Sequence, residues 1–135
     1  MISRDLALRL HDAGLAWSPA NGDRFWLPDR ELDEAVFIVS DMVVEVRERP
    51  SGRVLAFNGT TEWALDDVED REAVWLPRLD QLLDVLGGRF VSLIARSGGH
   101  VVRIEARQGE EEHVDVEAAD AAARAVLSVL AGLGS

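Results

Sequence analysis

The amino-acid sequence predicts a single α+β domain, residues 1–135, in which a mainly antiparallel sheet packs against an N-terminal, a middle and a C-terminal helix. Three observations predict this class. A length of 135 residues is typical of one domain with one core. Apolar residues recur at helical spacing near the start, middle and end of the chain, and they alternate with polar residues in between. Residues 1–59 are expected to form a helix and small antiparallel strands, and residues 60–135 a helix, a three-stranded meander and the last helix.

The first helix is expected in the stretch SRDLALRLHDAG. Ser3 is a good N-cap, because its side-chain oxygen accepts from backbone N–H groups of the first turn. Leu6, Leu10 and Ala13 follow at i, i+4 and i+7, so they lie on one face. Gly14 is suited to the C-terminal end of this helix.

Several short strands are expected next. The stretches RFWLP and AVFIVS each predict one strand, and the second is apolar enough to be the more fully buried of the two. Residues 41–59 predict a hairpin, because alternating apolar residues flank the turn sequence Pro50-Ser51-Gly52.

The tripeptide Trp-Leu-Pro occurs at residues 26–28 and again at 75–77. After the second copy, leucines at helical spacing and a closing Gly87-Gly88 predict the middle helix. These leucines are Leu79, Leu82, Leu83 and Leu86. After the first copy the chain is highly charged and runs into a strand, so the repeat is not a domain duplication. In both copies the Leu before Pro favours extended geometry, which predicts a strand end with Trp26 and Trp75 in or near the core.

The last part of the chain predicts a meander and a helix. RFVSLIAR, HVVRIEAR and HVDVEA predict three strands, joined by a turn at Gly98-Gly99 and by a loop, QGEEE. Alternation places Val102, Ile104 and Ala106 on one face of the second strand. In the third strand it places Val114 and Val116 inside, and Asp115 and Glu117 outside. ADAAARAVLSVLAGLG then predicts a helix that covers the sheet with the stripe Ala119, Ala122, Ala123, Val126, Leu127 and Leu130.

Composition excludes several classes of function. Without Cys, disulfides, thiolate nucleophiles and cysteine-ligated zinc are excluded. All 14 basic residues are Arg, so the chain has no lysine for a Schiff base or a phosphate-binding loop. A net charge of −11 repels a phosphate backbone, so nucleic acid is not an expected partner. No apolar run is long enough for a secretory signal or a membrane span, so a cytoplasmic location without membrane contact is expected.

The connection FNGTTEWALDD and the acidic run after it form the predicted partner-binding region, because loops on a rigid scaffold often carry binding residues. The candidate contact residues are Glu62, Trp63, Asp66, Asp67, Glu69 and Asp70. In the alternative interpretation, Thr60 or Thr61 caps a short helical turn, Trp63 fills the edge of the core, and the acids only favour solubility.

The sequence therefore predicts a non-enzymatic binding or regulatory protein that acts through protein–protein contacts. Its partner is expected to present a basic surface, and association with a second copy stays open. No cofactor, metal site or catalytic residue is predicted, since His11, His100 and His113 belong to no known catalytic or metal motif. The alternative is a small carboxylate- or metal-dependent hydrolase that uses Glu62 with Asp66 or Asp67.

The stretches SRDLALRLHDAGLAW, FNGTTEWALDDVE and WLPRLDQLLDVLGG resemble a family of small uncharacterised proteins of high-GC Gram-positive bacteria, many of which are labelled pilus assembly proteins. The resemblance covers nearly the whole chain, but the family brings no established activity to any residue. The order WLPRLDQLL, two hairpin strands and an Ala-rich helix is also similar to a small phage-borne domain in which a sheet lies between helices. These resemblances imply a role accessory to a pilus, secretion or phage-related system.

Overall fold

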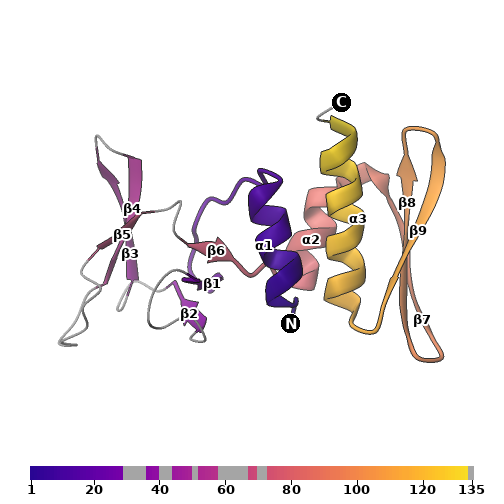
Figure 1. The fold of residues 1–135 in the computed structure, drawn as a ribbon, viewed down its shortest axis with the longest axis horizontal. Coiled ribbons are helices and arrows are strands. Elements are labelled where there is room, and N and C mark those ends of the chain that lie inside the picture. The colour runs from indigo at the N-terminus through magenta and orange to yellow at the C-terminus, as the bar shows by residue number, and fades with distance from the viewer. Residues whose placement is uncertain (29–35, 40–43, 50–51, 58–66, 70–72, 134–135) are drawn as a thin grey trace. The chain divides into compact units, whose positions relative to one another are not determined.

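A computed structural model describes residues 1–28, 36–39, 44–49, 52–57, 67–69 and 73–133 (Figure 1). Its helices and antiparallel sheets confirm the predicted α+β class. The chain divides into two compact units. We call Met1–Ala16 with Pro77–Ser135 the terminal unit, and Trp17–Leu76 the inserted unit.

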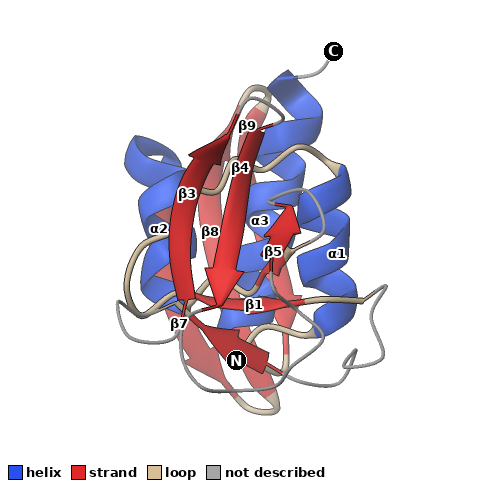
Figure 2. Ribbon diagram, turned by 90° about the vertical axis from the view of Figure 1, so that its left-hand side faces the viewer, coloured by secondary structure: helices blue, strands red, loops and turns tan. Residues whose placement is uncertain are grey.

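The terminal unit packs helices on a meander sheet. It contains α1 (Arg4–Asp12), α2 (Leu79–Leu86), the 3-10 helix η2 (Gly87–Arg89), β7 (Phe90–Arg96), β8 (Gly99–Ala106), β9 (Gly109–Asp115) and α3 (Ala118–Leu133). The strands pair in the antiparallel order β7-β8-β9. α3 lies between the sheet on one side and α1 and α2 on the other (Figure 1), and Figure 2 shows α1 and α2 flanking α3. The predicted first, middle and last helices and the meander are confirmed.

α1 begins as its sequence predicts and is tied to α3. The Ser3 hydroxyl accepts a hydrogen bond from the backbone N–H of Leu6 at 3.3 Å. The backbone N–H of Ser3 donates to Oδ1 of Asp120, a buried residue in the first turn of α3, at 2.7 Å. One residue thus caps α1 and bonds it to α3, and a buried carboxylate gains a partner.

α3 is buried more widely than the predicted stripe. Ala121 and Ala125, which lie outside that stripe, are fully buried along with Ala122 and Ala123. The reason is that α3 contacts helices on one side and strands on the other, so a single apolar face is not enough. Small side chains allow a close approach on both sides.

The described residues of the inserted unit form two antiparallel sheets. Its strands are β1 (Arg24–Trp26), β2 (Val36–Ile38), β3 (Val44–Arg49), β4 (Gly52–Phe57), β5 (Asp67–Glu69) and β6 (Val74–Trp75). They form the sheets β2-β1-β6 and β3-β4-β5, and the predicted hairpin is β3 with β4. β5 and β6 come after residue 59, the expected boundary between the two parts of the chain, yet they pair with β4 and β1 from before it.

The two Trp-Leu-Pro copies end neighbouring strands. β1 and β6 pair so that Trp26 lies opposite Val74. Leu27 and Leu76 are fully buried, whereas Trp26 and Trp75 are half-buried. The predicted strand ends are therefore confirmed, with the Leu rather than the Trp as the most buried residue of each copy.

Two further residues of the inserted unit depart from expectation. Ile38 in β2 is 53% exposed, so the AVFIVS strand is less buried than its composition predicts. Trp17, to which the sequence assigns no role, is buried, stacks on Trp75, and donates from Nε1 to Oδ2 of the buried Asp23 at 2.9 Å. This bond satisfies two buried polar groups at once.

β9 begins earlier than predicted. The stretch QGEEE is expected to be a loop, but only the turn at Arg107 and Gln108 separates the strands, and β9 starts at Gly109. Arg103 on β8 forms an ion pair with Glu110, with Nη2 and Oε2 2.6 Å apart. This cation offsets part of the repulsion within the acidic run.

The buried residues of β8 show which face of the sheet is turned toward α3. Val102 and Ile104 are fully buried, as predicted. His113 lies opposite Val102, and Glu111 lies opposite Ile104. Because directly opposite residues share a face of an antiparallel pair, His113 and Glu111 lie on the core side of the sheet, toward α3.

The predicted faces of β9 are therefore wrong. Val114 and Val116, expected inside, are 59% and 68% exposed. Asp115, expected outside, is hydrogen-bonded to Arg124 on α3. The physical reason is that polar residues on α3 provide partners for alternate acids of β9, so its polar side faces the helix.

Candidate functional site

Most of the predicted partner-binding residues lie outside the described residues. These are Glu62, Trp63, Asp66 and Asp70. Asp67 and Glu69 begin and end β5, opposite Ala56 and Val54 of β4. The contact run therefore stays a prediction, as does the alternative carboxylate pair of Glu62 with Asp66 or Asp67.

A polar cluster joins β9 to α3 in the terminal unit. The hydroxyl of Ser128 donates to Oε1 of Glu111 at 2.6 Å, and His113 bonds the same oxygen through Nε2 at 3.0 Å. A carboxylate oxygen only accepts, so His113 donates from Nε2. The bonds from Ser128 and His113 hold the pKa of Glu111 below its usual value, because they favour the ionised carboxylate.

A second link joins the same two elements. Nε of Arg124 donates to Oδ2 of Asp115 at 2.8 Å, and the backbone N–H of Val116 donates to Oδ1 at 2.7 Å. The hydrogen bond from Arg124 outweighs burial and, with that from Val116, holds the pKa of Asp115 below its usual value. Arg124 and Ser128 occupy positions i and i+4 of an otherwise apolar stretch of α3. That spacing is the sequence signal by which this polar face could have been found.

The geometry of the cluster favours a structural link over nucleophilic catalysis. A nucleophilic serine passes its proton to an adjacent base, most often a histidine. Here the hydroxyl of Ser128 bonds Glu111, and His113 donates to that same carboxylate instead of accepting from the serine. The lowered pKa of Glu111 also makes it a weak base.

The histidines occupy separate places in the terminal unit. His11 lies in the last turn of α1, and His113 belongs to the polar cluster. Nδ1 of His100 bonds the backbone oxygen of Val116 at 2.8 Å. Over the described ranges, no three His, Asp or Glu side chains come close enough together to hold a metal ion. None of the helices described there combines the length and the apolar character needed to cross a membrane.

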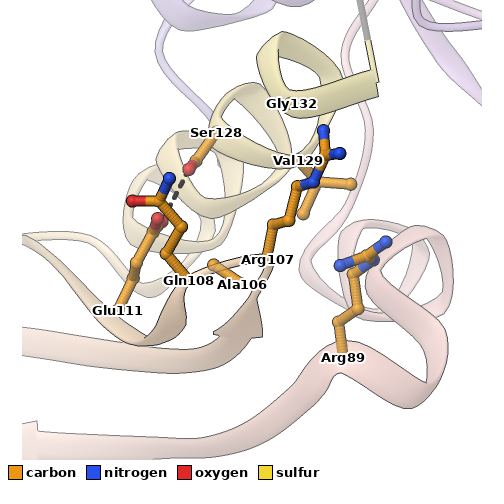
Figure 3. Close-up of a pocket in the computed structure, with 8 residues that line it drawn as sticks. All are labelled: Arg89, Ala106, Arg107, Gln108, Glu111, Ser128, Val129 and Gly132. Atoms are coloured by element: carbon orange, nitrogen blue, oxygen red, sulfur yellow. Dashed lines mark hydrogen bonds between the residues drawn. The ribbon is translucent and has the colours of Figure 1, made fainter. Parts of the chain in front are cut away.

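An open pocket of about 600 Å³ lies beside the polar cluster (Figure 3). Its wall comes from η2, the β8–β9 turn, β9 and the C-terminal half of α3. Side chains in this wall include Arg89, Arg107, Gln108, Glu111, Ser128 and Val129. Figure 3 shows the guanidinium groups of Arg89 and Arg107 on one side, and the bonded pair of Glu111 and Ser128 on the other. The pocket therefore has a cationic wall and an anionic wall.

The face of the β7–β9 sheet turned away from α3 carries an apolar row. Ile94, Val101 and Val114 lie opposite one another on the three strands. We call these three residues the outer row. Ile94 and Val114 are 40% and 59% exposed, whereas Val101 between them is 1% exposed. Two large aliphatic side chains thus face solvent on one side of the sheet.

Ion pairs share the face of the outer row. Glu112 of β9 lies 3.7 Å from Nε of Arg103 on β8 and 3.9 Å from Nη1 of Arg96 on β7. Arg103 also reaches Glu110 at 2.6 Å. All four side chains are more than a third exposed, so these pairs contribute little to stability. Arg96 lies opposite Gly99 and Glu112 lies opposite Arg103, so their ion pair crosses the row between Ile94 and Val114.

Comparisons with known proteins identify no relative. No protein-family model, no curated protein and no solved structure matches the chain. The resemblance to the family of high-GC Gram-positive bacteria therefore stays an expectation from the sequence.

Proposed function

We propose that the protein is a non-enzymatic binding protein that acts through protein–protein contacts, with the outer row at the centre of its contact surface. The observation that supports this proposal is the exposure of Ile94 and Val114 on one sheet face, on either side of the buried Val101. Exposed apolar surface with a polar rim is typical of interaction sites. The Arg103–Glu112 pair borders the row, and the Arg96–Glu112 pair crosses it between the two exposed side chains.

The proposed partner is a different protein with an apolar patch surrounded by basic side chains. The net charge of −11 attracts a basic surface over a long range and speeds its association. Two copies of this chain carry the same charge and repel each other, which disfavours pairing of two outer rows. The family resemblance suggests a pilus, secretion or phage-related system as the setting.

Site-specific photo-crosslinking in the native host tests this contact surface. A photoreactive amino acid replaces Val114 in one variant and Val85 in the control, because Val85 is also an exposed valine of the terminal unit but lies on α2. We expect one basic protein to be captured from position 114 and not from position 85.

Binding is then measured with the purified captured protein. Val114→Glu should weaken it at least about tenfold, since it places a charge at the centre of an apolar contact. Val85→Glu, the matched control, should bind like the unmodified chain, and association should slow as salt increases. Equal capture from both positions, or unchanged binding by Val114→Glu, contradicts the proposal. A dimer that Val114→Glu dissociates in sedimentation would replace the proposed partner with a second copy.

A further inference from the structure

The cationic wall of the pocket consists of two arginines, Arg89 and Arg107. Among the residues that the structure describes, neither Arg89 nor Arg107 forms an ion pair. By contrast, Arg96, Arg103 and Arg124 in the same unit each pair with an acid. Acids outnumber arginines by 25 to 14 in this chain, so partners are plentiful. The guanidinium groups of Arg89 and Arg107 therefore give one wall of the pocket a local excess of positive charge.

This wall is suited to a carboxylate. A guanidinium presents a planar set of donors that matches the two oxygens of a carboxylate or phosphate. Arg89 comes from η2 and Arg107 from the β8–β9 turn, so one anionic group between them links two elements of the fold. Both side chains are exposed, so a ligand displaces water there instead of an existing protein contact.

The opposite wall sets a second requirement. Glu111 is ionised, and both of its donors, Ser128 and His113, bond Oε1. Oε2 receives no hydrogen bond from the described residues and stays able to accept one. Gln108 lies beside Glu111 in Figure 3 and adds an amide. This wall attracts a hydrogen-bond donor and repels a second negative charge.

We propose that the pocket binds a small carboxylate that also carries an ammonium or hydroxyl group. The carboxylate lies between Arg89 and Arg107, and the donor group reaches Glu111. A volume of about 600 Å³ is within the usual range of small-molecule sites and leaves room for water around such a ligand. A dianion fits the cationic wall but meets the charge of Glu111, so the pocket selects against it.

Titration of the isotope-labelled full-length chain, followed by NMR chemical shifts, tests the proposal. The probes are serine, with an ammonium group; glycerate, with hydroxyls; propionate, with no donor; ethanolamine, with no acid; and malonate, a dianion. We expect saturable millimolar binding of serine or glycerate, with shifts confined to the pocket. Propionate should bind about tenfold more weakly, the loss expected when one charge-assisted hydrogen bond is removed. Ethanolamine and malonate should not saturate.

Substitutions in each wall test separately what that wall contributes to ligand binding. Arg107→Gln should weaken serine or glycerate binding about tenfold, because it removes one charge-assisted contact. Arg78→Gln, at an exposed arginine of the same unit that pairs with Asp80, is the matched control and should bind normally. Glu111→Gln should admit malonate, because its repulsive charge is gone. Circular dichroism checks that each variant is folded.

Three outcomes would overturn the inference. They are no saturable shift with serine or glycerate, an equal loss in Arg78→Gln and Arg107→Gln, and tighter binding of malonate than of glycerate by the unmodified chain. The pocket and the outer row are separate sites, so Val114→Glu should leave serine and glycerate binding unchanged. If the pocket proves not to bind these ligands, the proposed protein contact is unaffected. If the protein contact is refuted, the ligand-binding proposal is likewise unaffected.

Discussion

The two faces of the β7–β9 sheet use apolar and polar side chains in opposite ways. The face toward α3 combines the buried Val102 and Ile104 with acids that bond Ser128 and Arg124. The other face exposes Ile94 and Val114 of the outer row and pairs its charges with one another. In β9, the covered side of an edge strand is therefore set by what the neighbouring helix can bond, and not by apolar alternation alone.

The largest expected effect is a difference in the free energy of unfolding between substitutions on the two faces of the sheet. Ile104→Ala should lower the free energy of unfolding by about 2–5 kcal/mol, because it opens a cavity at a fully buried site. Val114→Ala on the other face should change it by less than about 0.5 kcal/mol. Urea denaturation of both variants measures the difference. Similar losses in the two variants would mean that Val114 is covered.

A backbone contact gives the next largest effect. A Cβ on Gly99 would lie 2.6 Å from the backbone oxygen of Asp115, where β8 and β9 meet. Gly99→Ala should therefore lower the free energy of unfolding by about 1–3 kcal/mol, since neither backbone can move aside freely. Gly88→Ala, where a Cβ meets no atom within 4 Å, is the control and should be close to neutral. A neutral Gly99→Ala in thermal melts would show that the strands separate at this end.

The helices and the meander could be predicted from local patterns, because their signals are close in sequence. Ser3 and Gly14 mark the two ends of α1, and Gly87 follows α2 with a φ of +56°. The faces of β9 could not be predicted in this way, because its acids depend on Arg124 and Ser128 in α3. Which acids of β9 find partners on α3 is known only once the helix is placed on the sheet.

The pocket and the outer row could not be predicted from local sequence patterns either. The pocket depends on Arg89 and Arg107, which belong to different elements and carry no shared motif. The outer row depends on the register of three strands. Alternation also predicted Val114 on the buried face of β9, whereas it lies on the exposed face. The bond between Trp17 and Asp23 crosses a turn-rich stretch in which neither residue stands out. The predicted contact residues between Glu62 and Asp70 lie largely outside the described ranges, so they neither support nor weaken these sites.

A smaller effect concerns the polar links to α3. Ser128→Ala should lower the free energy of unfolding by about 1 kcal/mol at neutral pH, because Glu111 loses its closest donor. The folded pKa of Glu111 is lowered, so its ionised form stabilises the fold above about pH 4, the usual pKa of a glutamate. That contribution is lost as the pH falls through the folded pKa.

Stability at several pH values measures this link. The difference between Ser128→Ala and the unmodified chain should therefore shrink as the pH falls below about 4. Ser97→Ala, at an exposed turn position, is the control and should show no such trend. A cost of Ser128→Ala that stays constant with pH would mean that packing, and not the bond to Glu111, carries the effect.

The smallest expected effect tests whether the outer row serves the fold at all. Thr keeps the branched shape and strand preference of Val, and it replaces one exposed methyl group by a hydroxyl that water can solvate. Val114→Thr should therefore change the free energy of unfolding by less than about 0.5 kcal/mol, while reducing the apolar area available to a partner. Denaturation and binding measured on the same preparation separate these roles. Weakened binding with unchanged stability would assign Val114 to the contact surface, whereas a loss of stability comparable to that of Ile104→Ala would place it in the core and remove the contrast between the two faces.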